Sequence, residues 1–320
     1  MPGTKASGQR TLKDRVSLAG IGVHFGKPVA ITISPADADS GISFLRTNLP
    51  DSSDVEIPAR ADAVGSTELC TVLGDPKGAS VATVEHLMAA LSGLAIDNAI
   101  VEIDGPEVPV MDGSARAFVD AIDQVGVVSQ SAPRRFIRVD KTVRVELGTS
   151  FAEFRPLNRF RLEVSIDFDC PVVGRQALGL DVTPKSFRRD IARARTFGYM
   201  RDVERLWAAG FALGSSLENS VVIGDGAVVN PEGLRFPDEF VRHKALDALG
   251  DLALSGAPIL GLYRSHKSGH KLNAMALSAL LSRSDAWTLV NEPAEREIRQ
   301  EGHTEPAQGL AAAVFAPEVL

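Results

Sequence analysis

The sequence predicts an α+β protein made of two halves with a similar plan. Short runs of apolar and polar residues predict strands in both halves. Each half also contains a helical segment rich in Ala and Leu, residues 82–93 and residues 240–251. Val84-Glu85-His86 in the first segment aligns with Val241-Arg242-His243 in the second. We interpret this match as an internal duplication; the alternative is a chance similarity between two helices of like composition.

The composition is that of an ordinary globular protein. The chain has 320 residues, a formal net charge of -7, 44% hydrophobic and 23% charged residues, which allows two domains. The acidic total argues against nucleic acid as the main partner, and the lack of a large hydrophobic surplus favours a monomer. Cys70 and Cys170 are too few for a disulfide framework. Without a signal peptide or an apolar run of about 18 residues, we expect a soluble cytoplasmic protein with no membrane span.

The first half is expected to begin with two strands between Thr11 and Ser34, joined by a turn that contains His24. A helix follows over residues 82–93, capped by Ser80 or Thr83 and ended by Gly93. A second helix over residues 114–125 should turn Phe118, Val119 and Ile122 inward. Further strands are expected at residues 42–45, 55–59, 68–73 and 98–103.

The polar segment 129–135 lacks periodicity, so we place the domain boundary there. The predicted domains are residues 1–130 and residues 134–290, followed by a disordered or loosely docked tail over residues 291–320. In the second domain, strands are expected at residues 136–145, 150–156, 160–168 and 259–263, and near Val221 and Val228. Helices are expected at residues 185–194, 202–209, 240–251 and 272–282.

The helix over residues 240–251 carries the first chemical signal. His243 and Asp247 are four residues apart and therefore lie on one face, as a pair that suits zinc. A solvated ion pair is the ordinary alternative. If the two halves face each other, His86 supplies a third ligand, and three protein ligands with one open position are typical of a catalytic zinc. Glu85, next to His86, could act as general base, or could simply be a first-turn carboxylate favoured by the helix dipole.

Five ordered motifs resemble a known family. They are Gly20-Ile21-Gly22-Val23-His24, Thr83-Val84-Glu85-His86-Leu87, Ala194-Arg195-Thr196-Phe197-Gly198, Phe240-Val241-Arg242-His243-Lys244 and Lys267-Ser268-Gly269-His270. From about Thr11 to about Leu281, the chain resembles the UDP-3-O-acyl-N-acetylglucosamine deacetylases. These zinc amidases commit Gram-negative bacteria to the synthesis of lipid A, the lipid of lipopolysaccharide.

The resemblance implies two similar two-layer domains, each a sheet on two helices, with the active site between them. It assigns the metal ligands to His86, His243 and Asp247 and the general base to Glu85. It makes His270 a second, protonated catalytic residue, held by Asp251, that donates a proton to the leaving amine. Otherwise, His270 would be an ordinary loop histidine.

The remaining assignments concern the substrate, a UDP-sugar lipid precursor. Thr196 corresponds to a threonine that holds the oxyanion, and Lys244 would face the diphosphate or sugar; they could instead be a helix-terminal threonine and a solvated lysine. Asp167 and Phe168 align with the uridine pocket. The segment from Phe197 to Val222 matches a hydrophobic passage for the acyl chain, although its apolar residues could equally be core. The candidates for the passage wall are Val203, Ala212, Leu217 and Val222.

The metal could be zinc or iron(II), since imidazole and carboxylate accept either. Cys70 aligns with a family cysteine near the metal, where it could bind a second ion, or it is a buried strand thiol. Two rival functions stay open from the residues alone. One is a zinc amidase for another acylated amino sugar, and the other is a non-catalytic homologue that binds a nucleotide or lipid.

Overall fold

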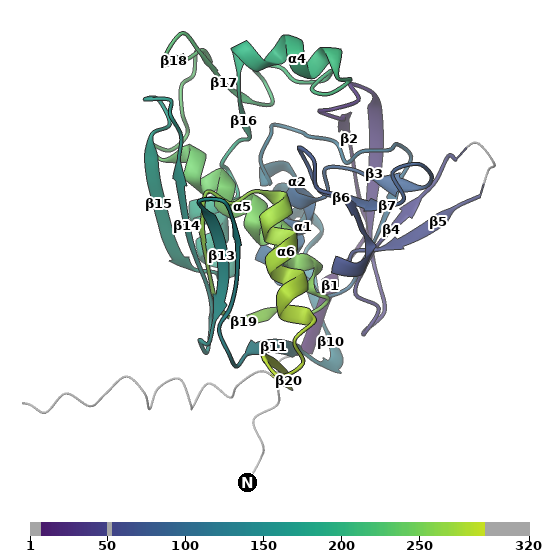
Figure 1. The fold of residues 1–320 in the computed structure, drawn as a ribbon. Helices are drawn as coiled ribbons and strands as arrows, with labels where there is room; N and C mark the ends of the chain where they lie inside the picture. Colours follow the sequence, from purple (N-terminus) through teal and green to yellow (C-terminus); the bar gives the residue numbers. More distant parts are fainter. Residues whose placement is uncertain (1–7, 50–52, 292–320) are drawn as a thin grey trace, which may run out of the picture.

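The computed structural model describes residues 8–49 and 53–291. Two sheets face each other, and Figure 1 shows helices α1, α5 and α6 between them. The first sheet has the strand order β2-β3-β9-β4-β5. Its strands are β2 (Val16–Ile21), β3 (Pro28–Pro35), β9 (Ala99–Ile103), β4 (Ile42–Arg46) and β5 (Val55–Pro58).

The second sheet repeats this pattern. Its central strand β19 pairs antiparallel with β13 and parallel with β14, just as β9 pairs with β3 and β4 in the first sheet. The outer strands β12 and β15 correspond to β2 and β5. These strands are β12 (Val143–Leu147), β13 (Ser150–Arg155), β19 (Ile259–His266), β14 (Phe160–Asp167) and β15 (Arg175–Asp181). Unlike the first sheet, the second also contains β11 (Arg135–Val139) and β20 (Trp287–Asn291), because β11 pairs with β19.

The terminal strands of each half repeat as well. β1 pairs antiparallel with β10, and β11 pairs antiparallel with β20. In both halves four sheet strands lead to a helix, then to the central strand, then to a second helix and a final strand, so the duplication is confirmed. These elements are β1 (Gly8–Leu12), β10 (Val127–Pro133), β11 (Arg135–Val139), β20 (Trp287–Asn291), α1 (Glu85–Gly93), α2 (Arg116–Val125), α5 (Glu239–Leu252) and α6 (His270–Leu281).

Each repeat carries an insertion at the same place, directly before its first helix. In the first repeat, a small sheet lies between β5 and α1: β6 (Val64–Ser66), β7 (Val72–Gly74) and β8 (Ser80–Val81). In the second repeat, the insertion between β15 and α5 contains α3 (Pro184–Ser186), β16 (Phe197–Tyr199), α4 (Val203–Ala208), β17 (Val221–Gly224) and β18 (Ala227–Val228). Both insertions therefore enter next to the helices that carry the candidate ligands.

The core lies where the sheets meet the helices. Val29, Ile31 and Ile33 of β3 are buried and alternate with more exposed residues, as expected of a strand with one solvated face. Phe118 and Ile122 of α2 are buried as predicted.

Helices α1 and α5, one from each repeat, cross at very close range. A Cβ added to Gly250 on α5 would lie 2.0 Å from the carbonyl oxygen of Glu85 on α1. Only glycine therefore allows the two backbones to approach this closely. The crossing fixes how far the side chains of α1 lie from those of α5.

One strand of the first half was predicted wrongly. The strand expected over residues 68–73 begins only at Val72, because Leu69 adopts a left-handed backbone with φ of 64° and is 47% exposed. The polar segment 129–135 belongs to β10 and the start of β11, since backbone pairing with β1 and β20 determines it rather than side-chain pattern. Since Arg134 joins β10 to β11, we propose it as the boundary between the predicted domains 1–130 and 134–290.

The predicted helix over residues 82–93 begins only at Glu85. Thr83 has a φ of 57° and its hydroxyl donates to Glu107, so neither Thr83 nor Ser80, which lies in β8, caps α1. The predicted strand 136–145 is two strands, β11 and β12, and the predicted helix 185–194 is α3 followed by a π-turn over Phe187–Ile191. Strands β15, β16 and β20 were not predicted. Of the predicted tail, residues 292–320 lie outside the described residues.

No helix within residues 8–49 and 53–291 is both long and apolar enough to cross a membrane.

We predict that Gly250→Ala destabilises the protein, because the new methyl group meets backbone atoms that no rotamer change can move. The overpacking should outweigh the helix propensity gained and lower the free energy of unfolding by about 2 kcal/mol. Urea denaturation measures this change. Gly198→Ala is the control, since a Cβ there has no neighbour within 4 Å. Unchanged stability of Gly250→Ala would contradict the close crossing.

Candidate active site

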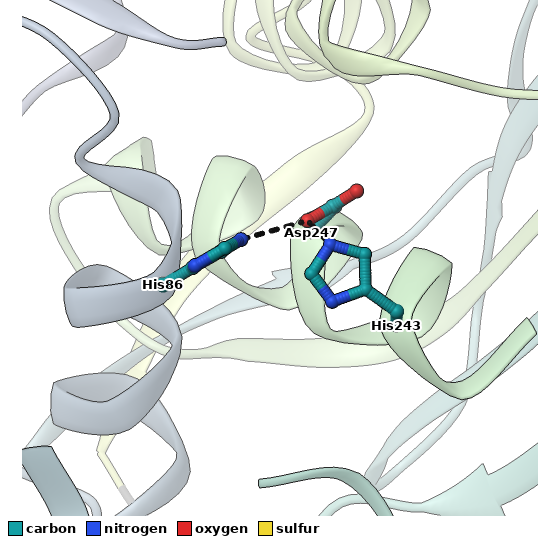
Figure 2. A group of neighbouring side chains, drawn as sticks. All are labelled: His86, His243 and Asp247. Atoms are coloured by element: carbon teal, nitrogen blue, oxygen red, sulfur yellow. Dashed lines mark ion pairs between the residues drawn. The ribbon is translucent and has the colours of Figure 1, made fainter. Parts of the chain in front are cut away.

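The crossing of α1 and α5 brings together the three predicted metal ligands. Figure 2 shows His86 reaching from α1 toward His243 and Asp247 on α5. One ligand atom from each residue lies within 4.8 Å of the others, and all three side chains are buried. His86 Nε2 is 3.5 Å and His243 Nε2 is 3.2 Å from the same oxygen, Asp247 Oδ1. The group is compact enough to hold a metal ion.

The hydrogen bonds of His243 show which of its nitrogens is free. Its Nδ1 lies 3.1 Å from the carbonyl oxygen of Ala194, which can only accept, so Nδ1 carries the proton. Burial lowers the pKa of His243 despite the charge of Asp247, so the ring is neutral and its Nε2 is a lone-pair acceptor. This acceptor faces Asp247 Oδ1, which has no hydrogen-bond partner. Two buried acceptors at 3.2 Å repel unless a cation lies between them.

The second oxygen of Asp247 is held by Lys244. Lys244 Nζ donates to Asp247 Oδ2 at 2.9 Å and also lies 5.6 Å from the centre of the Phe197 ring. Burial alone would raise the pKa of Asp247, but the neighbouring His243 and the charge of Lys244 outweigh it and hold the pKa well below its usual range. Asp247 is therefore an anion whose Oδ2 is hydrogen-bonded to Lys244 and whose Oδ1 is available to bind a metal ion.

Glu85 and His270 face each other beside the ligand group. His270 Nε2 lies 3.6 Å from Glu85 Oε1, and the backbone N–H of Thr71 donates to Glu85 Oε2 at 3.1 Å. Burial raises the pKa of Glu85 to about 7, with the charge of His270 opposing and those of Asp251 and Asp247 adding. A carboxylate with a pKa near neutrality is suited to accept and return a proton.

His270 stays charged although it is buried. Desolvation lowers the pKa of His270, but the carboxylates of Asp251 and Glu85 outweigh this effect and raise it to about 10. Asp251 Oδ2 lies 3.0 Å from His270 Nδ1. The imidazolium is thus a proton donor at neutral pH, next to a carboxylate that can accept a proton.

Asp251 is itself fixed from three sides. Its Oδ1 accepts the hydroxyl of Thr71 at 2.6 Å, and its Oδ2 accepts the amide of Asn273 at 2.8 Å as well as His270. Tyr263 donates to Asn273 Oδ1 at 2.6 Å. Residues of the first insertion, α6 and β19 therefore hold the carboxylate that orients His270.

The predicted oxyanion residue, Thr196, directly precedes β16 and lies two residues after Ala194. Its backbone N–H donates to Gly113 at 2.8 Å, and its carbonyl accepts Val221 N–H at 2.8 Å. The segment that supplies the Ala194 carbonyl to His243 thus also carries the Thr196 hydroxyl.

Aromatic rings connect the candidate uridine residues to the ligand group. Phe168 contacts Phe197 with ring centres 5.8 Å apart, and Phe197 lies 6.3 Å from the His243 ring. The carboxylate of Asp167 forms ion pairs with Lys267 at 3.1 Å and Arg175 at 3.6 Å. Phe168 is therefore close to the site, whereas Asp167 is already paired.

The candidate passage residues lie in the second insertion. Val203 begins α4, Val222 lies in β17, and Ala212 and Leu217 lie in the loop between them. This loop covers the turn that follows β2, because Leu213 N–H donates to the carbonyl of His24 at 3.0 Å. Figure 1 shows α4 near the end of β2. Large apolar side chains are exposed around the His24 turn and in the second insertion. They are Ile21 and Phe25 around the turn, and Met200, Trp207, Leu213 and Leu217 in the insertion.

The structure adds a buried carboxylate that the sequence reasoning missed. Glu107 accepts the backbone N–H groups of His24 at 3.0 Å and Phe25 at 3.0 Å, and the hydroxyl of Thr83 at 2.8 Å. It joins the His24 turn to the start of α1. The Nδ1 atom of the His24 ring is buried and has no hydrogen-bond partner, and burial lowers the pKa of this histidine. A Glu directly after the Gly105-Pro106 turn gave no signal of this role.

Cys70 is buried beside Glu85. Burial and, next, the charge of Glu85 raise the pKa of its thiol to about 12. The thiol is therefore protonated at neutral pH and poorly suited to bind an ion, which favours the buried-thiol interpretation.

Comparisons with known proteins place the chain in a family. A family model described as "UDP-3-O-acyl N-acetylglycosamine deacetylase" matches residues 9–282. A protein of Brucella ovis, named UDP-3-O-acyl-N-acetylglucosamine deacetylase, is 55% identical over 283 residues, which cover 88% of this chain and 98% of the relative. Relatives with the same name in Brucella canis and Brucella melitensis match to the same extent.

We predict that Asp251→Asn lowers the pKa of His270 from about 10. Losing the adjacent carboxylate charge should shift it down by about 1–3 units, since desolvation then meets less opposition. Histidine NMR titration of the metal-free protein measures the change. Asp181→Asn, in β15, is the control. An unshifted His270 would show that Glu85, and not Asp251, keeps the ring protonated.

Proposed function

Because this chain belongs to the family of UDP-3-O-acyl N-acetylglycosamine deacetylases, we propose that it removes the N-acetyl group of UDP-3-O-(3-hydroxyacyl)-N-acetylglucosamine. The reaction is a hydrolysis that yields the free amine and acetate, and it is the committed step of lipid A biosynthesis. We further propose that the enzyme acts as a monomer in the cytoplasm.

One observation carries the proposed metal site: the neutral Nε2 of His243 faces the unpartnered Oδ1 of Asp247 at 3.2 Å. With His86, these residues offer two imidazoles and a carboxylate, a donor set that suits zinc and also iron(II). A zinc ion held there would polarise the acetamide carbonyl and lower the pKa of water.

Glu85 takes the proton from the attacking water. Its pKa of about 7 places it where a base is effective at neutral pH, and the Thr71 N–H holds one oxygen so that the other faces the site.

His270 gives a proton to the departing nitrogen. It is charged at neutral pH and its Nδ1 is held by Asp251 at 3.0 Å, so the proton to be given is the one on Nε2, which lies 3.6 Å from Glu85 Oε1. Glu85 and His270 are thus a base and an acid whose environments keep them in opposite protonation states, the arrangement that general acid–base catalysis requires.

Thr196 and Lys244 provide the remaining polar contacts. The Thr196 hydroxyl donates to the oxygen that becomes negative as water adds to the carbonyl. Lys244, which lies against Phe197 and Asp247, offers its ammonium to the sugar or diphosphate.

The rest of the substrate extends away from this centre in two directions. Phe168 stacks on the uracil ring, and Asp167 lies at the same end of β14. The acyl chain follows the second insertion, past Phe197 and the wall formed by Val203, Ala212, Leu217 and Val222. The apolar residues exposed in the second insertion and around the His24 turn support this placement, since a lipid chain would cover them.

Acetate release is expected to depend on the metal. We predict that a chelator abolishes release from the UDP-linked substrate and that one equivalent of zinc restores it. An enzymatic acetate assay before and after chelation measures both steps. Turnover that survives complete removal of metal would exclude the three-ligand site. Zinc binding without turnover of this substrate would move the assignment to a different acylated amino sugar.

The variant Glu85→Ala tests whether Glu85 acts as the base without being a metal ligand. We predict that this variant retains zinc, because Glu85 is not a ligand, and loses turnover by about 10²–10⁴-fold. Metal content by mass spectrometry and kcat from acetate release are the two measurements. Glu68→Ala, at an exposed position, is the control. Near-normal turnover of Glu85→Ala would remove the base assignment.

A further inference from the structure

The helix that carries His243 begins with a buried acid. Glu239, one turn before His243, is 0% exposed and its carboxylate accepts four hydrogen bonds. Oε1 accepts the backbone N–H of Arg195 at 3.0 Å and its Nε–H at 2.9 Å. Oε2 accepts the other branch of the same guanidinium at 3.2 Å and the backbone N–H of Arg235 at 2.6 Å. Glu239 therefore holds both the side chain and the backbone of Arg195.

Arg195 is equally enclosed. It is 1% exposed, and its remaining N–H groups donate to Glu232 at 2.6 Å and to the Gly233 carbonyl at 2.7 Å. A buried ion pair usually stabilises a protein no more than apolar residues of the same size would. Net stability is thus a weak reason for this pair. A fixed geometry, which the fork of the guanidinium provides, is a better one.

The peptide groups on either side of Arg195 belong to the active site. The Ala194 carbonyl accepts the Nδ1–H of His243 at 3.1 Å and so sets the orientation of that ring. On the other side, Thr196 carries the hydroxyl proposed for the oxyanion. The position of Arg195 therefore determines two groups that act on the metal and the substrate.

The contacts of Glu239 and His243 connect these two α5 residues through the segment 194–195. From Glu239 the connection runs to the backbone of Arg195, to the Ala194 carbonyl, to the His243 ring, and back along one turn of α5 to Glu239. We propose that Glu239 and Arg195 are a positioning pair that fixes the Ala194 carbonyl and thereby the orientation of the His243 imidazole toward the metal. The inference rests on the proposed metal site.

The consequence is measurable without turnover. If the carbonyl can shift, the His243 ring loses the partner that fixes its tautomer and direction, and metal binding must then order the ring. Partners that orient a metal-ligating histidine typically contribute 10–100-fold to metal affinity. We therefore expect loss of the Glu239 contact to weaken metal binding by about tenfold or more.

Two variants test this, each with Co²⁺ as the probe. Glu239→Gln keeps the size but turns one acceptor into a donor, so Arg195 loses at least one contact, and the Arg235 N–H loses its partner too if the amide group replaces Oε2. Glu239→Asp keeps the charge but is too short to reach both branches, and it carries the test if Glu239→Gln does not fold. Co²⁺ affinity by chelator competition, the visible Co²⁺ spectrum and the melting temperature of the metal-free protein are measured for each.

Asp238→Asn is the matched control. Asp238 precedes Glu239 and pairs with Arg242 at 2.6 Å, but no hydrogen bond joins it to Ala194, Arg195 or Thr196. We expect wild-type Co²⁺ affinity and spectrum in this variant, and weaker binding with an altered spectrum in the Glu239 variants. The spectrum reports ligand geometry, which a purely structural role would not change.

Glu239 variants that melt earlier but bind Co²⁺ with wild-type affinity and spectrum would overturn the proposal and leave the metal site intact. Equal weakening in Asp238→Asn would also overturn it, because the effect would then belong to α5 as a whole. Failure of the wild-type protein to bind Co²⁺ would instead overturn the metal site itself.

Discussion

The close crossing of α1 and α5 is the contact on which the site depends. Each helix comes from a different repeat, and Gly250 lets the backbones approach until a Cβ would lie 2.0 Å from the Glu85 carbonyl. Only at this distance does His86 reach the oxygen of Asp247 that His243 also faces. The proposed metal site is therefore formed at the interface between the repeats, and neither repeat contains all three residues.

The same crossing buries several charges, and each has a partner of opposite sign. Along α5, Glu239, His243, Asp247 and Asp251 recur every four residues and form one buried polar stripe. Arg195, Lys244 and His270 neutralise its three carboxylates. Asp247 Oδ1 is the exception, because it has no hydrogen-bond donor. A cation is expected where a buried carboxylate oxygen has no donor.

The sequence predicted the parts of the site that local geometry controls. Spacing of four residues placed His243, Asp247 and Asp251 on one face, and the family resemblance, now confirmed, paired them with His86 and His270. It could not predict Glu239 or Glu107, because their partners lie 44 and 83 residues away and no pattern connects them. Strand β10 was missed for a related reason, since its pairing with β1 overrode the local pattern.

The repeats match in topology but differ in the residue before the shared histidine. In α1 that residue is Glu85, which faces His270 across 3.6 Å. In α5 it is Arg242, which turns away to Asp238 and the Asp190 carbonyl. The two equivalent positions therefore have different roles: Glu85 enters the site as the proposed base, whereas Arg242 pairs outside it. The proposed acid, His270, comes from α6 of the second repeat, so the acid–base pair combines one residue from each repeat rather than two equivalent ones.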